Sequence, residues 1–300
     1  IPRAILPEVK ESMDDYGRVS QDIMRLQPPI LGVAGDQQAS LFGHCCFEEG
    51  QAKATYGTGC FILMNTGAHA VPSKNGLVTT VAASTKGELR YALEGSVFNA
   101  GSTVQWLRDE LGLIKDASET EELALSVPDT AGTYLVPAFT GLGAPWWDAE
   151  ARGLICGLTR GCTRAHLARA ALESIAYQAY DVLEAMRNDF PCDIEELAVD
   201  GGGSQNRFTM GWQAGLLQRP VVRPKTAEVT ALGAAYLAGL NAGYWKDLES
   251  LRANAVQATR FKPEIAAELR QQSLDGWYRA LNRARGCERR RSTPRVSSGL

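Results

Sequence analysis

The stretch Val199-Asp200-Gly201-Gly202-Gly203-Ser204-Gln205-Asn206 sets a triple glycine between an apolar run and a polar segment. This order predicts a strand that closes on Asp200, a tight turn, and a helix that opens near Gln205. Glycine allows a ligand to approach the backbone closely, and the free N–H groups at a helix start favour an anion. Asn206 lies one position into that helix, where its amide could hydrogen-bond a base or a ribose. A strand–helix turn with an ordinary N-cap explains the same residues, and the spacing fits neither GxGxxG nor a Walker loop.

A hydroxyl residue between two glycines forms the second candidate site, Tyr56-Gly57-Thr58-Gly59. Such a turn exposes backbone donors, together with the hydroxyl of Thr58, to a phosphate. A plain hairpin turn between predicted strands over 52–56 and 60–64 accounts for it equally well. Both interpretations stay open for this segment.

An acidic residue marks the third candidate, Gly35-Asp36-Gln37-Gln38, which follows the apolar run 30–35. The run predicts a buried strand, and a carboxylate at the end of such a strand commonly points into a cleft. There Asp36 could accept a proton from a hydroxyl or hold a metal ion. An aspartate N-cap at the start of the next helix is the alternative.

Helical periodicity follows two predicted hairpins. In a helix predicted over 96–113, Gly101 and Gln105 lie one turn apart and could flank a flat ligand, although packing is the commoner reason for such a pair. Alternation of helix and strand after the hairpins predicts an α/β protein with a mixed sheet flanked by helices. The predicted elements are hairpin strands over 52–56, 60–64, 77–82 and 89–93, helices over 163–187, 205–218 and 229–240, and strands over 197–199 and 221–222.

The composition is that of a folded globular protein. The chain has 300 residues, of which 45% are hydrophobic and 22% charged, with a net charge of −3. These values exclude a disordered chain, a collagen-like repeat and a small disulfide scaffold. No stretch approaches the roughly 18 apolar residues of a membrane span, and residues 1–10 lack the pattern of a signal peptide. Because the chain begins at Ile1, we expect a processed protein or part of a longer one.

Cysteine and histidine give no sign of a metal site. The seven cysteines are odd in number and form no CxxC pair, which indicates a reduced, cytoplasmic protein. His44, His69 and His166 have no spacing suited to metal ligation, so we expect no metal ligand set. The arginine-rich end suggests either a nucleic-acid arm or a disordered tail. Because no aromatic residue follows Tyr278, we favour the tail and expect no nucleic-acid partner.

Taken in this order, the segments resemble the FGGY family of carbohydrate kinases, and within it the glycerol kinases most closely, over about residues 30–260. The run 153–173 fits the C-terminal signature of the family throughout. That signature is Gly-x-apolar-x-Gly-apolar, seven residues, a polar–apolar pair, and a small-small-apolar-acid ending at Glu173. The other segments that carry the resemblance are Gly35-Asp36-Gln37-Gln38, Tyr56-Gly57-Thr58-Gly59-Cys60-Phe61, Met64-Asn65-Thr66-Gly67, and residues 98–108 and 137–145.

The resemblance implies a ribonuclease-H-like fold of the actin/hexokinase ATPase type, in which two such domains enclose ATP and substrate. This chain is similar to the C-terminal domain. We therefore expect a connector from a missing N-terminal domain over residues 1–25, the ATPase-type domain over 26–265, and a C-terminal helix with a basic, disordered tail over 266–300.

Residue by residue, the resemblance implies a catalytic base at Asp36, which takes the proton of the polyol hydroxyl. It implies substrate contacts at Gln37, by hydrogen bonding, and at Phe61, by apolar packing. Thr58 is similar to the residue beside the transferred phosphoryl group. The positions similar to the family's nucleotide contacts are Thr58, Gly101, Gln105, Gly202 and Asn206.

The resemblance also implies the partners. They are ATP with Mg²⁺, glycerol as the acceptor, the missing N-terminal domain, and further copies of the chain in a homo-oligomer of the full-length enzyme. Another FGGY kinase, acting on a pentulose or a different polyol, is one alternative, although Gln37 and Phe61 favour glycerol. A catalytically incomplete nucleotide-binding module is the other. We expect no kinase turnover from this chain alone.

Overall fold

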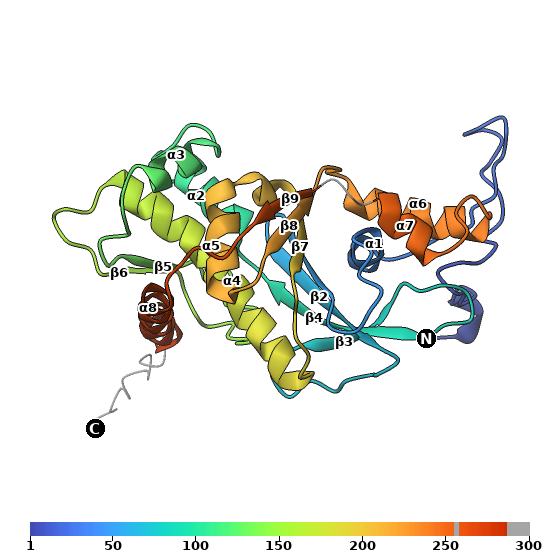
Figure 1. The fold of residues 1–300 in the computed structure, drawn as a ribbon, viewed down its shortest axis with the longest axis horizontal. Helices are drawn as coiled ribbons and strands as arrows, with labels where there is room; N and C mark the ends of the chain where they lie inside the picture. The colour runs from blue at the N-terminus through green and yellow to red at the C-terminus, as the bar shows by residue number, and fades with distance from the viewer. Residues whose placement is uncertain (255–257, 287–300) are drawn as a thin grey trace, which may run out of the picture.

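A seven-stranded mixed sheet runs through the molecule (Figure 1). The computed structural model describes residues 1–254 and 258–286, so the tail predicted beyond residue 286 lies outside the described residues. The strand order is β3-β4-β2-β1-β7-β8-β9. These strands are β1 (Ala52–Tyr56), β2 (Cys60–Gly67), β3 (Val78–Ala82), β4 (Arg90–Val97), β7 (Leu197–Asp200), β8 (Val221–Pro224) and β9 (Ala258–Phe261), and a separate ribbon pairs β5 (Tyr134–Val136) with β6 (Leu154–Cys156).

The direction of each strand pair follows from the connection between its members. β1, β2, β4 and β3 are antiparallel neighbours, as the two predicted hairpins require. β1 pairs in parallel with β7, and β7 with β8, and parallel neighbours need long crossovers that here contain helices. β9 returns antiparallel to β8. The predicted mixed α/β sheet is therefore confirmed.

Helices cover both faces of this sheet (Figure 1). They are α1 (Asp36–Gly43), α2 (Gly101–Asp109), α3 (Glu119–Leu125), α4 (Arg164–Asp189), α5 (Arg207–Leu217), α6 (Val229–Asn241), α7 (Leu248–Asn254) and α8 (Ala267–Gly286). On one face, Val182 of α4 shares a buried core with Ile62 of β2 and Leu93 of β4. On the other face, Leu41 of α1 packs with Leu63 of β2, and α6 lies behind α1. Burial on both sides explains why β2 is apolar along most of its length.

Residues 30–35 do not form the strand that their apolar run predicts. Their extended backbone bonds elsewhere: Val33 N donates to Ser12 O at 3.0 Å, and Asn241 Nδ2 of α6 donates to Leu31 O at 2.9 Å. The apolar side of the run faces the same helix, since Ala34 packs in the cluster of Leu237. Helix α6 thus takes the place of a sheet neighbour, and the segment leads directly into α1.

Two predicted helix starts also shift. The helix expected from residue 96 begins at Gly101, because Ser96 still belongs to β4, where its carbonyl accepts from Ala144 N at 2.9 Å. The helix expected from Gln205 is divided into a 3₁₀ turn, η2 (Gly202–Gln205), and α5. The short elements α3, β5, β6 and β9 have no counterpart in the prediction.

A buried carboxylate fastens α8 to the rest of the fold. Asp181 of α4 is 4% exposed, and its Oδ2 accepts from Trp277 Nε1 of α8 at 2.9 Å and from Trp146 Nε1 at 3.2 Å. The ring of Trp277 stacks on Tyr177 of α4 with centroids 5.3 Å apart. Burial raises the pKa of Asp181 to about 7, against the lowering effect of these hydrogen bonds.

Asp181→Asn should change how stability depends on pH. Because the pKa of Asp181 rises from 3.8 to about 7 on folding, the unfolded chain ionises first, and the free energy of unfolding falls as pH rises through this window. An asparagine oxygen can accept from both indoles without ionising. The variant should therefore gain up to about 4 kcal/mol relative to wild type between about pH 4 and about pH 7.

Thermal unfolding of both proteins at about pH 4 and about pH 8 measures this difference. Asp275→Asn, on the exposed side of α8, is the control and should follow the wild-type profile. Parallel profiles for Asp181→Asn and wild type would contradict the prediction.

Candidate active site

The triple-glycine loop is held against the end of β1. Gly201 has φ +81°, and a Cβ at this position would lie 2.5 Å from Tyr56 O. Both the conformation and the close approach require glycine here. The loop therefore follows β7 without side chains that would separate it from the turn after β1.

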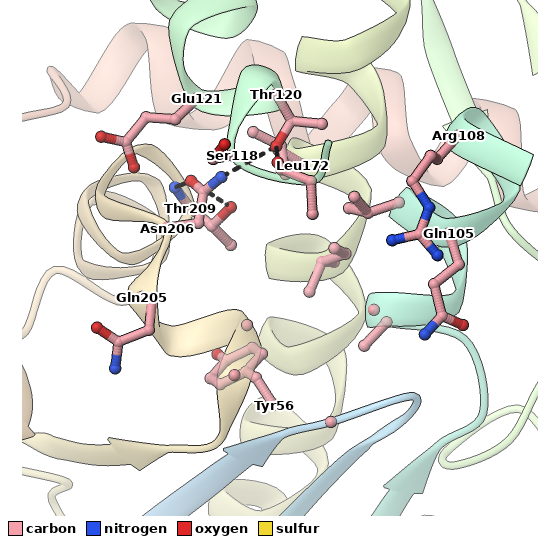
Figure 2. Close-up of a pocket in the computed structure, with 18 of the residues that line it drawn as sticks. Tyr56, Gln105, Arg108, Ser118, Thr120, Glu121, Leu172, Gln205, Asn206 and Thr209 are labelled. Carbon is pink, nitrogen blue, oxygen red and sulfur yellow. Dashed lines mark hydrogen bonds between the residues drawn. The ribbon is translucent and has the colours of Figure 1, made fainter. Parts of the chain in front are cut away.

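A cavity of about 630 Å³ opens beside this loop (Figure 2). Tyr56 lies at its base, and Gln105 and Arg108 of α2 lie across it from Asn206 (Figure 2). The wall opposite the sheet comes from α3 and the residues before it. The five residues expected at the nucleotide, Thr58, Gly101, Gln105, Gly202 and Asn206, all line this one cavity.

The start of α2 is docked on the turn between β1 and β2. Gly101 N donates to Gly57 O at 3.0 Å and Ala100 N donates to Thr58 O at 2.9 Å. A Cβ on Gly101 would lie 2.6 Å from Gly57 O. Backbone packing alone therefore explains why residue 101 is a glycine, which was the commoner of the two explanations for Gly101 and Gln105. The same contact aligns Gln105 along the cavity wall.

Gly202 differs from Gly101 in what surrounds it. A Cβ at Gly202 would meet nothing within 4 Å, and its φ lies outside the left-handed region. Neither packing nor conformation in the described part of the chain requires glycine at this position. Because Gly202 lines the cavity, the open space beside it is the space a ligand would fill.

Asn206 has a structural role as well as a place in the cavity wall. Its Oδ1 accepts from Thr209 N at 2.9 Å, so it is the N-cap of α5. Its Nδ2 donates to Thr120 Oγ1 of α3 at 3.3 Å. The N-cap interpretation of the glycine segment and the cavity interpretation are thus both realised in this residue.

The wall formed by α3 is the part of the cavity that sequence reasoning missed. Thr120 and Glu121 contact α5 through Asn206 and the backbone N–H of Arg207. Ser118 and Glu121 have the three-residue spacing of a capping box, which is the signal that could have indicated a helix start. In the structure Glu121 bonds to α5 rather than to its own helix, so this carboxylate joins two walls of the cavity.

The predicted substrate residues Asp36, Gln37 and Phe61 do not line the 630 Å³ cavity. Asp36 is the first residue of α1, and its exposed carboxylate accepts from Gln37 N at 2.8 Å and from Gln37 Nε2 at 3.3 Å. The alternative of an aspartate N-cap is also wrong in detail, because Gly35 is the N-cap and Asp36 is the first residue of the helix. Asp36 therefore opens a helix and does not close a strand.

Strand register brings Phe61 to the same face of the sheet as α1. Phe61 of β2 pairs with Thr55 of β1, which in turn pairs with Asp200 of β7. Directly paired residues project to one face, and Ser40 of α1 donates to Asp200 Oδ2 at 2.8 Å on that face. Phe61 is 37% exposed, so its ring is open to solvent beside the helix that carries Asp36.

Thr58 lies between the two groups of residues. It is in the turn that joins β1 to β2, with Thr55 and Phe61 on the strands beneath it. The turn lines the cavity on one side, and the strands lead to the α1 face on the other. Thr58 thus lies where the cavity beside the triple-glycine loop meets the polar edge that carries Asp36.

Residues 1–254 and 258–286 contain no group of three or more His, Cys, Asp and Glu side chains arranged to hold a metal. In the same part of the chain, no helix combines the length and apolarity needed to cross a bilayer.

Comparison with known proteins identifies the family of most of the chain. The model of the FGGY family of carbohydrate kinases, C-terminal domain, matches residues 52–242. Glycerol kinase 1 of Clostridium tetani is 54% identical over 289 residues, which are 96% of this chain and 58% of that protein. Glycerol kinase of Shewanella oneidensis is 56% identical over 285 residues, again 58% of its length. The chain thus spans less than two thirds of the length of these relatives.

Solved structures share the fold. Glycerol kinase of Plasmodium falciparum with ADP has a TM-score of 0.87 and 36% identity, over 94% of this chain and 56% of that one. Xylulose kinase of Lactobacillus acidophilus has a TM-score of 0.80 at 22% identity, over 94% of this chain and 57% of that one. The expected ribonuclease-H-like fold of the actin/hexokinase ATPase type is confirmed. With this fold, the family match and more than half of its residues shared with glycerol kinases, the chain belongs to the FGGY family of carbohydrate kinases.

Proposed function

We propose that this chain is the C-terminal part of an ATP-dependent glycerol kinase, an enzyme that transfers a phosphoryl group from ATP to glycerol and releases ADP and glycerol 3-phosphate. The observation that carries the proposal is the convergence of five expected nucleotide contacts, from three segments separated in sequence, on one cavity. The identity of 52–56% to proteins named glycerol kinase supports the acceptor.

The cavity suits a nucleotide. Backbone from the turn after β1 and from the triple-glycine loop offers N–H groups to phosphates, and Thr58 adds a hydroxyl. Gln105 and Asn206 stand on opposite walls, where their amides can bond the edges of a ribose or a base. Arg108 brings a positive charge to the same space.

Asp36, Gln37 and Phe61 form the wall for the polyol. Phosphoryl transfer requires chiefly that the attacking hydroxyl be positioned and that charge be stabilised. Asp36 accepts the proton of that hydroxyl, Gln37 hydrogen-bonds the polyol, and the exposed ring of Phe61 packs against its carbon chain. Thr58 lies next to the phosphoryl group in transit.

Mg²⁺ enters this site with the nucleotide as part of the substrate. It is commonly held by phosphates, water and only one or two carboxylates, so a dedicated cluster of ligands is not needed. Asp36 is an exposed carboxylate at the edge where the phosphoryl group would arrive. The ion supplies charge neutralisation of the phosphates when bound.

The proposal includes the organisation of the enzyme. Residues 1–25 serve as a connector, 26–265 as the ATPase-type domain, and 266–300 as a terminal helix and tail. The partners are glycerol, the N-terminal part of the enzyme and further copies of it in a homo-oligomer. The described cysteines are all free thiols, which fits the cytoplasm.

The first prediction of this proposal concerns the chain by itself. It should bind ADP but show no glycerol-dependent ADP release, because the polyol wall is open to solvent at Asp36 and Phe61. Calorimetric titration with ADP tests nucleotide binding, and a coupled ADP-release assay tests the absence of glycerol-dependent turnover. A form extended to the length of the relatives should be active, and robust turnover by the 300-residue chain would contradict the prediction.

Asp36→Asn tests the proton acceptor in the extended form. Loss of the carboxylate should lower kcat by about 10²- to 10⁴-fold, the usual contribution of a general base. The Kd for ADP should stay within about twofold, since Asp36 does not line the nucleotide cavity. A near-normal kcat would remove Asp36 from this role.

Gly202→Val tests whether the open space beside the loop is the nucleotide site. A Cβ at this position has no protein atom within 4 Å and lies at the cavity, so the Kd for ADP should rise at least about tenfold with little change in Tm. Gly211→Val is the matched control, because a Cβ there also meets nothing within 4 Å and Gly211 does not line the cavity. Equal ADP affinity in the two variants would place the nucleotide elsewhere.

A further inference from the structure

Lys53 is a charged side chain in the interior of the sheet. It lies in the middle of β1, between Leu63 of β2 and Ala198 of β7, and it is 0% exposed. Moving an ammonium group out of water costs several kcal/mol unless other groups compensate. A lysine at this position therefore indicates a role that an apolar side chain could not perform.

The direct partners of Lys53 are neutral oxygens. Its Nζ donates to Gln37 Oε1 of α1 and, at 2.8 Å, to Thr55 Oγ1 two residues along β1. Among the described residues, no carboxylate lies within 4.0 Å of this ammonium. Its hydrogen bonds thus position an amide and a hydroxyl, and they do not form a close ion pair.

Two carboxylates act on the ammonium from beyond hydrogen-bond distance. Asp200 at the end of β7 and Glu94 of β4 both act on Lys53, and Asp36 of α1 acts on Glu94. Burial lowers the pKa of Lys53 to about 8, while Asp200 and Glu94 oppose this shift. The positive charge is therefore influenced by carboxylates of two different strands, β7 and β4.

The bond to Lys53 fixes which way the Gln37 amide points. An ammonium group only donates, so it selects the orientation in which Oε1 faces it. The NH₂ group of Gln37 then points the other way and donates to Asp36 Oδ2 at 3.3 Å. A chain of two hydrogen bonds runs from the buried lysine to the exposed carboxylate.

Thr55, the other partner of Lys53, links the lysine to the residues that precede the triple-glycine loop. Thr55 Oγ1 lies 3.4 Å from Ser40 Oγ, which donates to Asp200 Oδ2 at 2.8 Å. Asp200 also contacts His44 Nε2 at 3.1 Å and directly precedes the triple-glycine loop. The position of the lysine is therefore set by groups that also hold β7 and α1 together.

We propose that Lys53 is a positioning residue for phosphoryl transfer, which locks the Gln37 amide so that its NH₂ group faces Asp36 and the reacting hydroxyl of the polyol. This inference rests on the proposed kinase function. Lys53 itself touches no substrate, because it is fully buried; it acts through Gln37.

The test uses the extended, active enzyme and the variant Lys53→Met, which keeps an unbranched apolar stem of similar volume and removes the ammonium with its donors. A freely rotating Gln37 should raise the KM for glycerol and lower kcat, with a combined loss in kcat/KM of about 10- to 100-fold. The Kd for ADP should stay within about twofold, because neither residue lines the nucleotide cavity. Lys86→Met, at the exposed tip of the β3–β4 hairpin, is the control and should leave all three values unchanged.

A double-mutant cycle with Gln37→Leu separates positioning from a general structural role. If Lys53 acts through Gln37, then Lys53→Met should reduce kcat/KM by less than about twofold further in the Gln37→Leu background. Lys53→Gln, which keeps an N–H donor without the charge, should recover part of the activity and serves in the cycle if Lys53→Met does not fold.

The outcomes are distinct. Wild-type kinetics in a folded Lys53 variant, or an undiminished effect of the substitution in the Gln37→Leu background, overturns the inference alone. If the wild-type enzyme fails to phosphorylate glycerol, the proposed function falls and this inference falls with it.

Discussion

The candidate site depends on one close backbone approach. The end of β1 meets two other segments there, and the positions that touch it are glycines: a Cβ on Gly201 would lie 2.5 Å from Tyr56 O, and one on Gly101 would lie 2.6 Å from Gly57 O. Any side chain at these positions would force the segments apart. Because α2 and η2 begin at this junction, its width sets the distance between the walls that carry Gln105 and Asn206.

The two faces of the central strands differ in how they are stabilised. The face toward α4 is largely apolar and is stabilised chiefly by packing. The face toward α1 carries the buried side chains of Lys53 and Asp200 and the half-buried Thr55, and burial of such polar groups is costly unless hydrogen bonds compensate it. Their hydrogen bonds therefore form a connected network, and this network reaches the surface at Asp36 and Gln37. The polar face thus ties the stability of the sheet to the geometry of the site.

Local signals in the sequence predicted the hairpins, the long helix and the glycine turns, because each depends on neighbours in the chain. The strand expected over 30–35 was wrong, since only the tertiary contact with Asn241 of α6 decides what bonds to that backbone. Helix α3 was missed because its role, joining α5 through Glu121, lies between elements remote in sequence. Local patterns marked the triple-glycine segment, the Thr58 turn and Asp36 as candidate sites, and the family resemblance assigned their roles and added Phe61. Lys53 gave no signal, because a lysine in a strand looks exposed until the register shows it to be buried.

In this fold the backbone shapes one part of the candidate site and side chains form the other, and this difference affects substrate specificity. The cavity that we propose for the nucleotide is shaped largely by backbone approach, which persists as long as the glycines and the sheet do. Xylulose kinase of Lactobacillus acidophilus keeps the fold, with a TM-score of 0.80, at only 22% identity. The wall that we propose for the polyol is instead formed by the side chains of Asp36, Gln37 and Phe61. Under this proposal, a change of acceptor requires new side chains at that wall and leaves the backbone junction intact, so differences in substrate should lie on the α1 face of the sheet.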